Sequence, residues 1–151
     1  MIATVNTERA YKLYLPSTTT KHLIDVKDIV RIQSISNYSK LFFSDGRTLV
    51  VAKILGWFEQ QLQTREFVRV HRTHMINTDY IYQWQTNKGG SKLELTNGEQ
   101  IDVSVRRKAG VLKFLKNQFV VEKVSGDTIN TEGAFKSIQS GISLVVVKDA
   151  R

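Results

Sequence analysis

The chain has 151 residues and no cysteine, so thiol catalysis, disulfide bonds and cysteine-ligated zinc are excluded. Hydrophobic residues make up 41% and charged residues 24%, which is ordinary for one folded globular domain with or without an appendage. The formal net charge of +8 lies entirely in residues 1–117, which hold 18 basic and 10 acidic residues, because residues 118–151 hold four of each. This imbalance favours a polyanionic partner, most often nucleic acid, although a merely basic surface would carry the same charge.

Membrane and export signals are missing from the sequence. It has no long uninterrupted apolar run, and its first residues, MIATVNTERAYK, lack the apolar core of a signal peptide. We therefore expect a cytoplasmic protein that makes no contact with a membrane.

Short strands are predicted along most of the chain, because segments rich in apolar and β-branched residues recur between turn residues. Asp45-Gly46 predicts a hairpin, since glycine readily adopts the positive φ of a tight turn. Asn97-Gly98 likewise predicts the last turn of a three-stranded meander. The predicted strands are 11–15, 22–33, 38–43, 48–52, 80–85, 91–96, 99–103 and 142–148.

Two helices are predicted from apolar residues at helical spacing, over 53–63 and over 104–118. Ser104 is the predicted N-cap of the second helix. The residues expected to form the apolar faces are Ile54, Leu55, Phe58 and Leu62 in the first helix and Val105, Ala109, Leu112 and Leu115 or Lys116 in the second. The sequence therefore predicts a mainly β fold with two short helices.

Three cations stand at the start of the second predicted helix. A capping box would place Glu or Gln three residues after Ser104, but Arg107 occupies that position, between Arg106 and Lys108. The partial positive charge of a helix N-terminus makes each of these cations unfavourable by roughly 0.3–1 kcal/mol. A phosphate backbone would be attracted by both the helix end and the cations, so this pattern favours a functional role.

A second cluster of bases lies in REFVRVHRTHMINTDYI, residues 65–81. Arg69, His71, Arg72 and His74 are crowded among apolar residues that look like pieces of a strand. Two histidines three residues apart in an extended segment should point to opposite faces, and only His22 remains elsewhere as a further histidine. We therefore expect neither a metal site nor a cofactor here.

Enzymatic motifs are missing as well. The serines near residue 36 lie in no Gly-x-Ser-x-Gly turn, and NKGGSK has the pattern of a hairpin turn rather than a phosphate-binding loop. No pair of carboxylates is placed beside a nucleophile. We expect a protein that is not an enzyme and whose arginines clamp phosphates or bind guanine edges.

Several blocks of the sequence together resemble a LytTR DNA-binding domain. They are DIVRIQSISNYSKLFFSDGRTLVV, a short amphipathic helix, FVRVHRTHMINTDYI, a Gly-containing hairpin and GEQIDVSVRRKAGVLKFL, in the order typical of that family. The resemblance covers roughly residues 11–116. These modules are usually the output domains of bacterial response regulators, and they consist of short antiparallel strands in an elongated arrangement.

The resemblance implies duplex DNA as the partner, with loops inserted into successive major grooves of bent DNA. It also implies repeated half-sites and two copies of the protein on DNA, even where the free protein is monomeric. Asn77 is expected to hold the loop's own backbone, with Phe67, Val70, Ile76 and Ile81 in the core. The residues expected to contact bases or backbone are Asn37, Tyr38, Ser39, Lys40, His71, Arg72, His74, Arg106 and Arg107.

Two domains are expected, a LytTR-like domain over residues 1–117 and an extension of unknown role over 118–151. In the extension, FVVEKV and ISLVVVK are expected to pair and pack on the domain as extra structure. The other possibility is a dimerisation or partner-docking surface, since an apolar strand edge readily pairs with another chain. The alternative function is therefore a non-enzymatic module that engages a partner regulator through the core and the extension.

No receiver domain is expected before the LytTR-like region, because the chain has no room for one there. Control would then come from a partner, from the expression level or from the extension.

Overall fold

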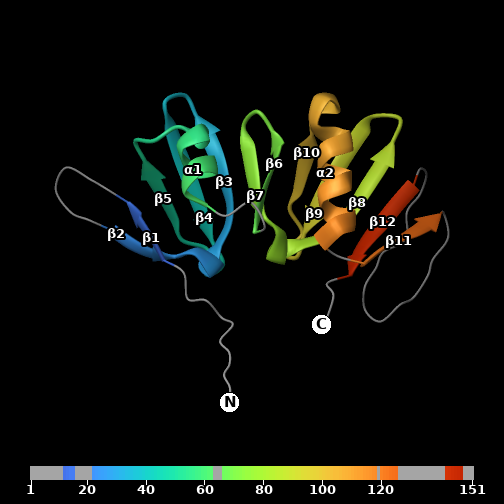
Figure 1. Cartoon of the computed structure of the whole chain (residues 1–151), viewed down its shortest axis with the longest axis horizontal. Helices are drawn as coiled ribbons and strands as arrows, with labels where there is room; N and C mark the ends of the chain where they lie inside the picture. The colour runs from blue at the N-terminus through green and yellow to red at the C-terminus, as the bar shows by residue number, and fades with distance from the viewer. Residues whose placement is uncertain (1–11, 16–21, 63–65, 119, 126–141, 148–151) are drawn as a thin grey trace, which may run out of the picture.

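Short antiparallel strands and two helices make up the described part of the chain, which comprises residues 12–15, 22–62, 66–118, 120–125 and 142–147. In this computed structural model, two five-stranded sheets lie side by side along the long axis, with a two-stranded hairpin at one end (Figure 1). The expected fold class, mainly β with two helices in an elongated arrangement, is confirmed. Among the described residues, no helix combines the length and the apolarity that crossing a membrane requires.

The first sheet has the strand order β5-β4-β3-β7-β6 and is antiparallel throughout. Its neighbour at the end of the molecule is the hairpin of β1 and β2. Gly46, with a φ of 93°, confirms the tight turn expected between β4 and β5. The strands are β1 (Lys12–Leu15), β2 (His22–Asp25), β3 (Ile29–Ile35), β4 (Tyr38–Phe43), β5 (Thr48–Val51), β6 (Phe67–His71) and β7 (His74–Asn77).

The second sheet has the order β10-β9-β8-β12-β11 and includes the expected three-stranded meander. Gly98 has a φ of 92° in the turn between β9 and β10, as its sequence predicts. The pairing expected within residues 118–151 is confirmed, because β11 pairs with β12, and β12 pairs with β8. The strands are β8 (Ile81–Asn87), β9 (Gly90–Leu95), β10 (Gln100–Val103), β11 (Val120–Ser125) and β12 (Ile142–Val147).

The hairpin of β6 and β7 contributes to two hydrophobic cores at once. Alternate side chains of a strand point to opposite faces, so Phe67 and Met75 enter the core beneath α1 (Leu55–Gln61). Val70 and Ile76 enter the core beneath α2 (Val105–Gln118). Burial of Phe67, Val70, Ile76 and Ile81 confirms their expected place in the core. The hairpin is thus fixed from both sides, midway along the long axis of the molecule (Figure 1).

The predicted strand 22–33 is wrong in one respect, because the structure divides it. A short 3-10 helix (Val26–Asp28) separates β2 from β3. This turn moves β2 out of the first sheet and allows it to pair with β1 instead.

The expected apolar faces of both helices also need correction. Ile54 is 57% exposed, because it precedes α1 as the N-cap residue. Val105 is 88% exposed at the first position of α2, and Ala109 is exposed as well. Leu115 is buried and Leu112 is partly buried, as expected, and Val111 completes the buried stripe of α2. The other three residues expected on the apolar face of the first helix are buried.

Candidate nucleic-acid interface

Three segments that carry predicted contact residues lie along one edge of the molecule: the β3–β4 turn, the β6–β7 turn and the start of α2 (Figure 1). Backbone hydrogen bonds connect them. The Ser34 amide donates to the Thr73 carbonyl oxygen over 2.9 Å, and the Ser104 amide donates to the Val70 carbonyl oxygen over 2.9 Å. The β6–β7 hairpin is therefore bonded to both of the other segments, which fixes the spacing between all three.

Arg69 organises the β6–β7 turn from within. Its guanidinium donates to the Glu59 carboxylate over 2.7 Å and to the Arg72 carbonyl oxygen over 2.7 Å, and its Nε lies 3.4 Å from the His71 carbonyl oxygen. This arginine is therefore occupied inside the protein. The Arg72 side chain is exposed, and in the described part of the chain no hydrogen bond or ion pair engages it. Arg69 orients the turn, and Arg72 is the cation that the turn presents.

His71 and His74 are cross-strand partners in this hairpin, so the expectation that they point to opposite faces is wrong. The segment is two strands rather than one, and the imidazole rings lie 5.9 Å apart. The Thr73 amide donates to His71 Nδ1 over 3.2 Å, and Thr73 Oγ1 lies 2.9 Å from the same nitrogen. Thr73 Oγ1 also lies 3.0 Å from His74 Nδ1, so Thr73 connects the two rings.

His74 is half-buried, and this burial is the main reason that its pKa is lowered. The positive charges of Arg31 and His71 lower the pKa of His74 further, and they outweigh the carboxylates of Asp102 and Glu99, which act in the opposite direction. His74 is accordingly a neutral ring near pH 7 and contributes a hydrogen-bonding group rather than a charge to this edge.

The β3–β4 turn places its predicted contact residues in different environments. Asn37 and Tyr38 are exposed, and Lys40 is half-buried with its ammonium 5.2 Å from the centroid of the Phe42 ring. Ser39 is fully buried, and its hydroxyl donates to the Lys53 carbonyl oxygen over 2.7 Å. Ser39 therefore supports the turn from inside, and the turn exposes Asn37 and Tyr38.

The start of α2 carries three cations, of which Arg106 is exposed while Arg107 and Lys108 are half-buried. Within the residues that the structure describes, neither Arg106 nor Arg107 forms an ion pair or hydrogen bond through its side chain. Unpaired guanidinium groups at a helix N-terminus attract an anion, because the amides and the cations act on it together. This end of the helix is suited to a phosphate or to the edge of a guanine.

Arg31 is a functional support that the sequence analysis missed. It is 8% exposed, and it donates from Nε and Nη2 to the two Glu99 carboxylate oxygens over 3.0 and 2.9 Å. Its guanidinium also lies 3.6 Å from the centroid of the Phe42 ring. The hydrogen bonds from Arg31 lower the pKa of Glu99 despite partial burial, so the carboxylate remains ionised. This bidentate pair joins the first sheet to the β9–β10 turn of the second.

Asn77 holds the backbone, as expected. It is buried, its side-chain amide donates to the Ile29 carbonyl oxygen over 2.8 Å, and its side-chain oxygen accepts from the Asp79 amide over 2.9 Å. Asn77 therefore fixes the end of β7 against β3 and takes no place on the exposed edge.

The family model of the LytTr DNA-binding domain matches residues 19–116. The chain belongs to this family. Membership in the LytTR family assigns DNA binding to the domain, and the matched region contains all three segments of the edge described above.

Two curated proteins are similar to part of this chain. The chain is 29% identical over 99 residues to RcoM 2 of Paraburkholderia xenovorans strain LB400, a heme-containing CO-sensing transcriptional regulator, with coverage of 66% of this chain and 37% of the relative. It is 31% identical over 85 residues to RcoM 1 of the same organism, which has the same description, with coverage of 56% and 32%. The chain thus spans about a third of the length of these relatives.

A solved structure shares the fold. The LytTr DNA-binding domain of a protein described as a methyl-accepting/DNA response regulator from Bacillus cereus superposes with a TM-score of 0.60 and 20% identity. The superposition covers 69% of this chain and 95% of that one. At this identity the likeness shows a common fold.

Proposed function

We propose that this protein is a cytoplasmic bacterial transcription regulator that binds duplex DNA in a sequence-specific manner. The β3–β4 turn, the β6–β7 turn and the start of α2 would enter successive major grooves on one face of bent DNA. The observation that carries the proposal is the shared edge on which these three bonded segments lie, with Arg72, Arg106 and Arg107 unpaired within the described chain. Family membership supports the DNA-binding part of it.

Different residues would act in different ways at this edge. Arg72 and Arg106 are exposed and carry the fork of donors that fits the two acceptors of a guanine edge. His71, Lys40 and Arg107 are half-buried, which suits contacts to the phosphate backbone that position the duplex. Ser39 and His74 would act indirectly, because they fix the turns that present the contacting residues.

Two copies of the protein on repeated half-sites are also part of the proposal. A single domain of this size covers few base pairs, so one copy would discriminate poorly among competing genomic sites. A protein partner that engages β11 and β12 is the second possibility for the extension, because β11 is the last strand in the order of its sheet.

The deciding experiment is selection from a randomised duplex pool at near-physiological salt, followed by sequencing of the retained fraction. We expect an enriched motif with repeated half-sites. Retention of duplexes without an enriched motif would mean that binding is driven by charge alone. It would favour a protein partner that engages the extension. Affinity for the selected site should also fall steeply with salt, since each neutralised phosphate releases counterions.

Replacement of Arg106 by alanine tests the proposed base contact. We expect Arg106→Ala to cost roughly 1–3 kcal/mol of binding free energy and to relax the preference at one base pair. The matched control is Lys113→Ala, which removes one charge from an exposed position two turns further along α2. Equal losses on selected and scrambled duplexes would make Arg106 a phosphate contact instead.

A further inference from the structure

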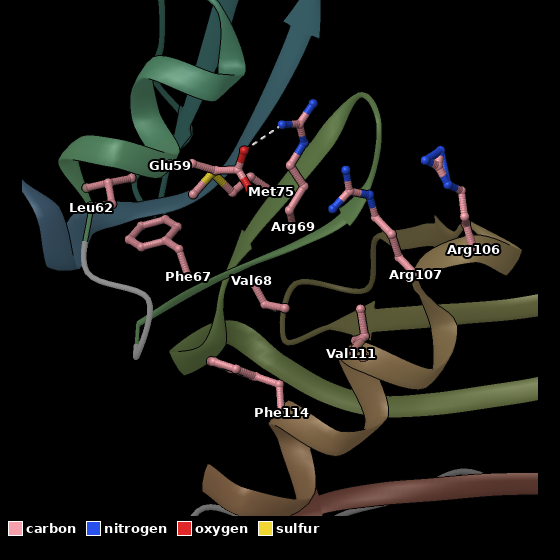
Figure 2. Close-up of a pocket in the computed structure, with 11 residues that line it drawn as sticks. Glu59, Leu62, Phe67, Val68, Arg69, Met75, Arg106, Arg107, Val111 and Phe114 are labelled. Carbon is pink, nitrogen blue, oxygen red and sulfur yellow. Dashed lines mark hydrogen bonds and ion pairs between the residues drawn. The ribbon is translucent and has the colours of Figure 1, made fainter.

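A groove with a volume of about 330 Å³ lies beside the proposed DNA-binding edge (Figure 2). It is bounded by α1, by the β6–β7 hairpin and by α2, so both halves of the molecule contribute to it. The lining residues that the argument uses are Glu59, Val68, Arg69, Arg107, Gly110 and Phe114.

Apolar and cationic side chains both line this groove. Phe67, Val68 and Val111 form a buried floor, and Phe114 adds a half-buried ring at one end. Arg69, Arg106 and Arg107 also line the groove, and Figure 2 shows the Arg106 side chain set apart from the other two. A molecule that fills the groove would therefore meet both an apolar surface and positive charge.

The positive charge of these arginines is only partly neutralised within the protein. Three arginines and one glutamate line the groove, and the glutamate, Glu59, already accepts a hydrogen bond from Arg69 over 2.7 Å. Arg106 and Arg107 form no side-chain hydrogen bond or ion pair among the described residues. Two guanidinium groups of the groove lining are thus available.

We propose that this groove binds a small organic acid whose apolar body lies on the floor and whose carboxylate is held by Arg107. Guanidinium and carboxylate groups match geometrically, and such pairs are among the stronger hydrogen-bonded contacts in proteins. The volume lies at the lower end of the range of small-molecule sites, which suits a single short chain or ring.

Occupancy of the groove would oppose DNA binding, and this consequence rests on the function proposed above. Arg106 and Arg107 belong both to the groove and to the start of α2 that would face the duplex. A carboxylate bound to Arg107 would compete with DNA phosphates and base edges for the same donors. The acid would therefore act as a ligand that lowers the affinity for DNA.

Gly110 offers a substitution that fills the groove. It lines the groove, no atom lies within 4 Å of a Cβ built on it, and its φ is not positive. Gly110→Phe places a ring in the groove and removes a poor helix former, so we expect this variant to fold. The matched control is Ala109→Phe, at the neighbouring exposed position of α2 that does not line the groove.

The test is a titration of the full chain with decanoate, below its micelle-forming concentration and without DNA, followed by amide NMR. We expect saturable shifts near Val68, Val111 and Phe114 in the unsubstituted protein and in Ala109→Phe. In Gly110→Phe, decanoate should bind at least tenfold more weakly. Shifts that grow linearly without saturation, or equal binding by Gly110→Phe, would overturn the site.

A second measurement tests the competition with DNA. Saturating decanoate should weaken binding of the selected duplex several-fold in the unsubstituted protein and in Ala109→Phe but leave Gly110→Phe unchanged, with acetate at equal ionic strength as the reference. Saturable decanoate binding with unchanged DNA affinity would overturn the competition. Because the first titration contains no DNA, it tests ligand binding in the groove even if sequence-specific DNA binding is itself disproved.

Discussion

The two exposed turns of the proposed interface are built in opposite ways. In the β6–β7 turn, side chains hold the backbone: Arg69 donates to two carbonyl groups, and Thr73 lies between the rings of His71 and His74. In the β3–β4 turn, Ser36 has a φ of 57°, and Asn37 and Tyr38 are exposed. The main side-chain support there is the buried hydroxyl of Ser39.

This contrast suggests that the two turns have different roles in DNA binding. A turn that is hydrogen-bonded internally keeps one geometry, so its cation meets DNA at a fixed position and loses little conformational entropy on binding. A turn with exposed, unbonded side chains can adapt to different partners, and it loses more entropy when it does so. We expect the β6–β7 turn to set the register on DNA and the β3–β4 turn to adjust to the local sequence.

The largest loss of DNA affinity should come from removal of the side-chain hydrogen bonds that hold the β6–β7 turn. Arg69→Ala deletes hydrogen bonds to Glu59 and to the Arg72 carbonyl group, so the turn loses its fixed geometry. We expect DNA binding to weaken by roughly 1.5–3 kcal/mol, the range for hydrogen bonds to charged groups, as measured by fluorescence anisotropy.

The control for this variant is Arg47→Ala, which removes the same charge from the exposed β4–β5 turn at the other end of β4. Comparable losses in the two variants would mean that Arg69 acts only through net charge. In that case the two exposed turns would not differ in the way proposed.

A smaller effect, on the free energy of unfolding, is expected from substitutions at the strained backbone of the β3–β4 turn. A positive φ costs a residue with a side chain about 1 kcal/mol, and a β-branched residue more. Ser36→Val should therefore lower the free energy of unfolding by about 1 kcal/mol, and Ser36→Gly should leave it unchanged or raise it. Urea denaturation of the pair measures this. Equal stability of the two variants would show that the positive φ carries no strain.

The smallest effect is expected on the pH dependence of the free energy of unfolding, through His74 in the β6–β7 hairpin. His74 has a pKa below its usual value of 6.5, so the unfolded chain takes up this proton first as the pH falls. The contribution of His74 to stability is complete above pH 6.5 and decreases as the pH falls below it. Denaturation between about pH 8 and 5.5 should show a slope that is shallower in His74→Gln.

His74 and the Arg31–Glu99 pair lose their contributions to stability in different pH ranges. The pKa of Glu99 is lowered from 4.5, so the contribution of Glu99 is lost only as the pH falls below that value. Identical slopes for His74→Gln and the unsubstituted protein above pH 5.5 would contradict the role given to His74.

Local turn chemistry was predictable from the sequence, whereas the pairing of distant residues was not. Asp45-Gly46 and Asn97-Gly98 predicted two turns because the required positive φ is a property of the glycine itself. The Arg31–Glu99 pair joins residues 68 positions apart, and no spacing rule connects them. The division of residues 22–33 depends on β2 pairing with β1, which is equally invisible in the segment itself.

Parts of the candidate site could have been found by applying the strand period more strictly. Ser39 is in phase with Leu41 and Phe43, which are buried in β4, so its own burial follows from an alternation of two. His71 and His74 were misplaced because Arg72-Thr73 lacks the Asn-Gly or Asp-Gly signal of a tight turn. Arg106 and Arg107 were recognisable because three cations at a helix start are unfavourable for stability alone.

The position of β12 in the second sheet bears on how the protein is made. β12 lies between β8 and β11, although it is the last of the described strands to be synthesised. While the ribosome is still adding residues 126–141, β8 has no neighbour on one side, and an unpaired edge of this kind can join another chain. Completion of the sheet therefore waits until Ile142–Val147 has been synthesised and pairs with β8.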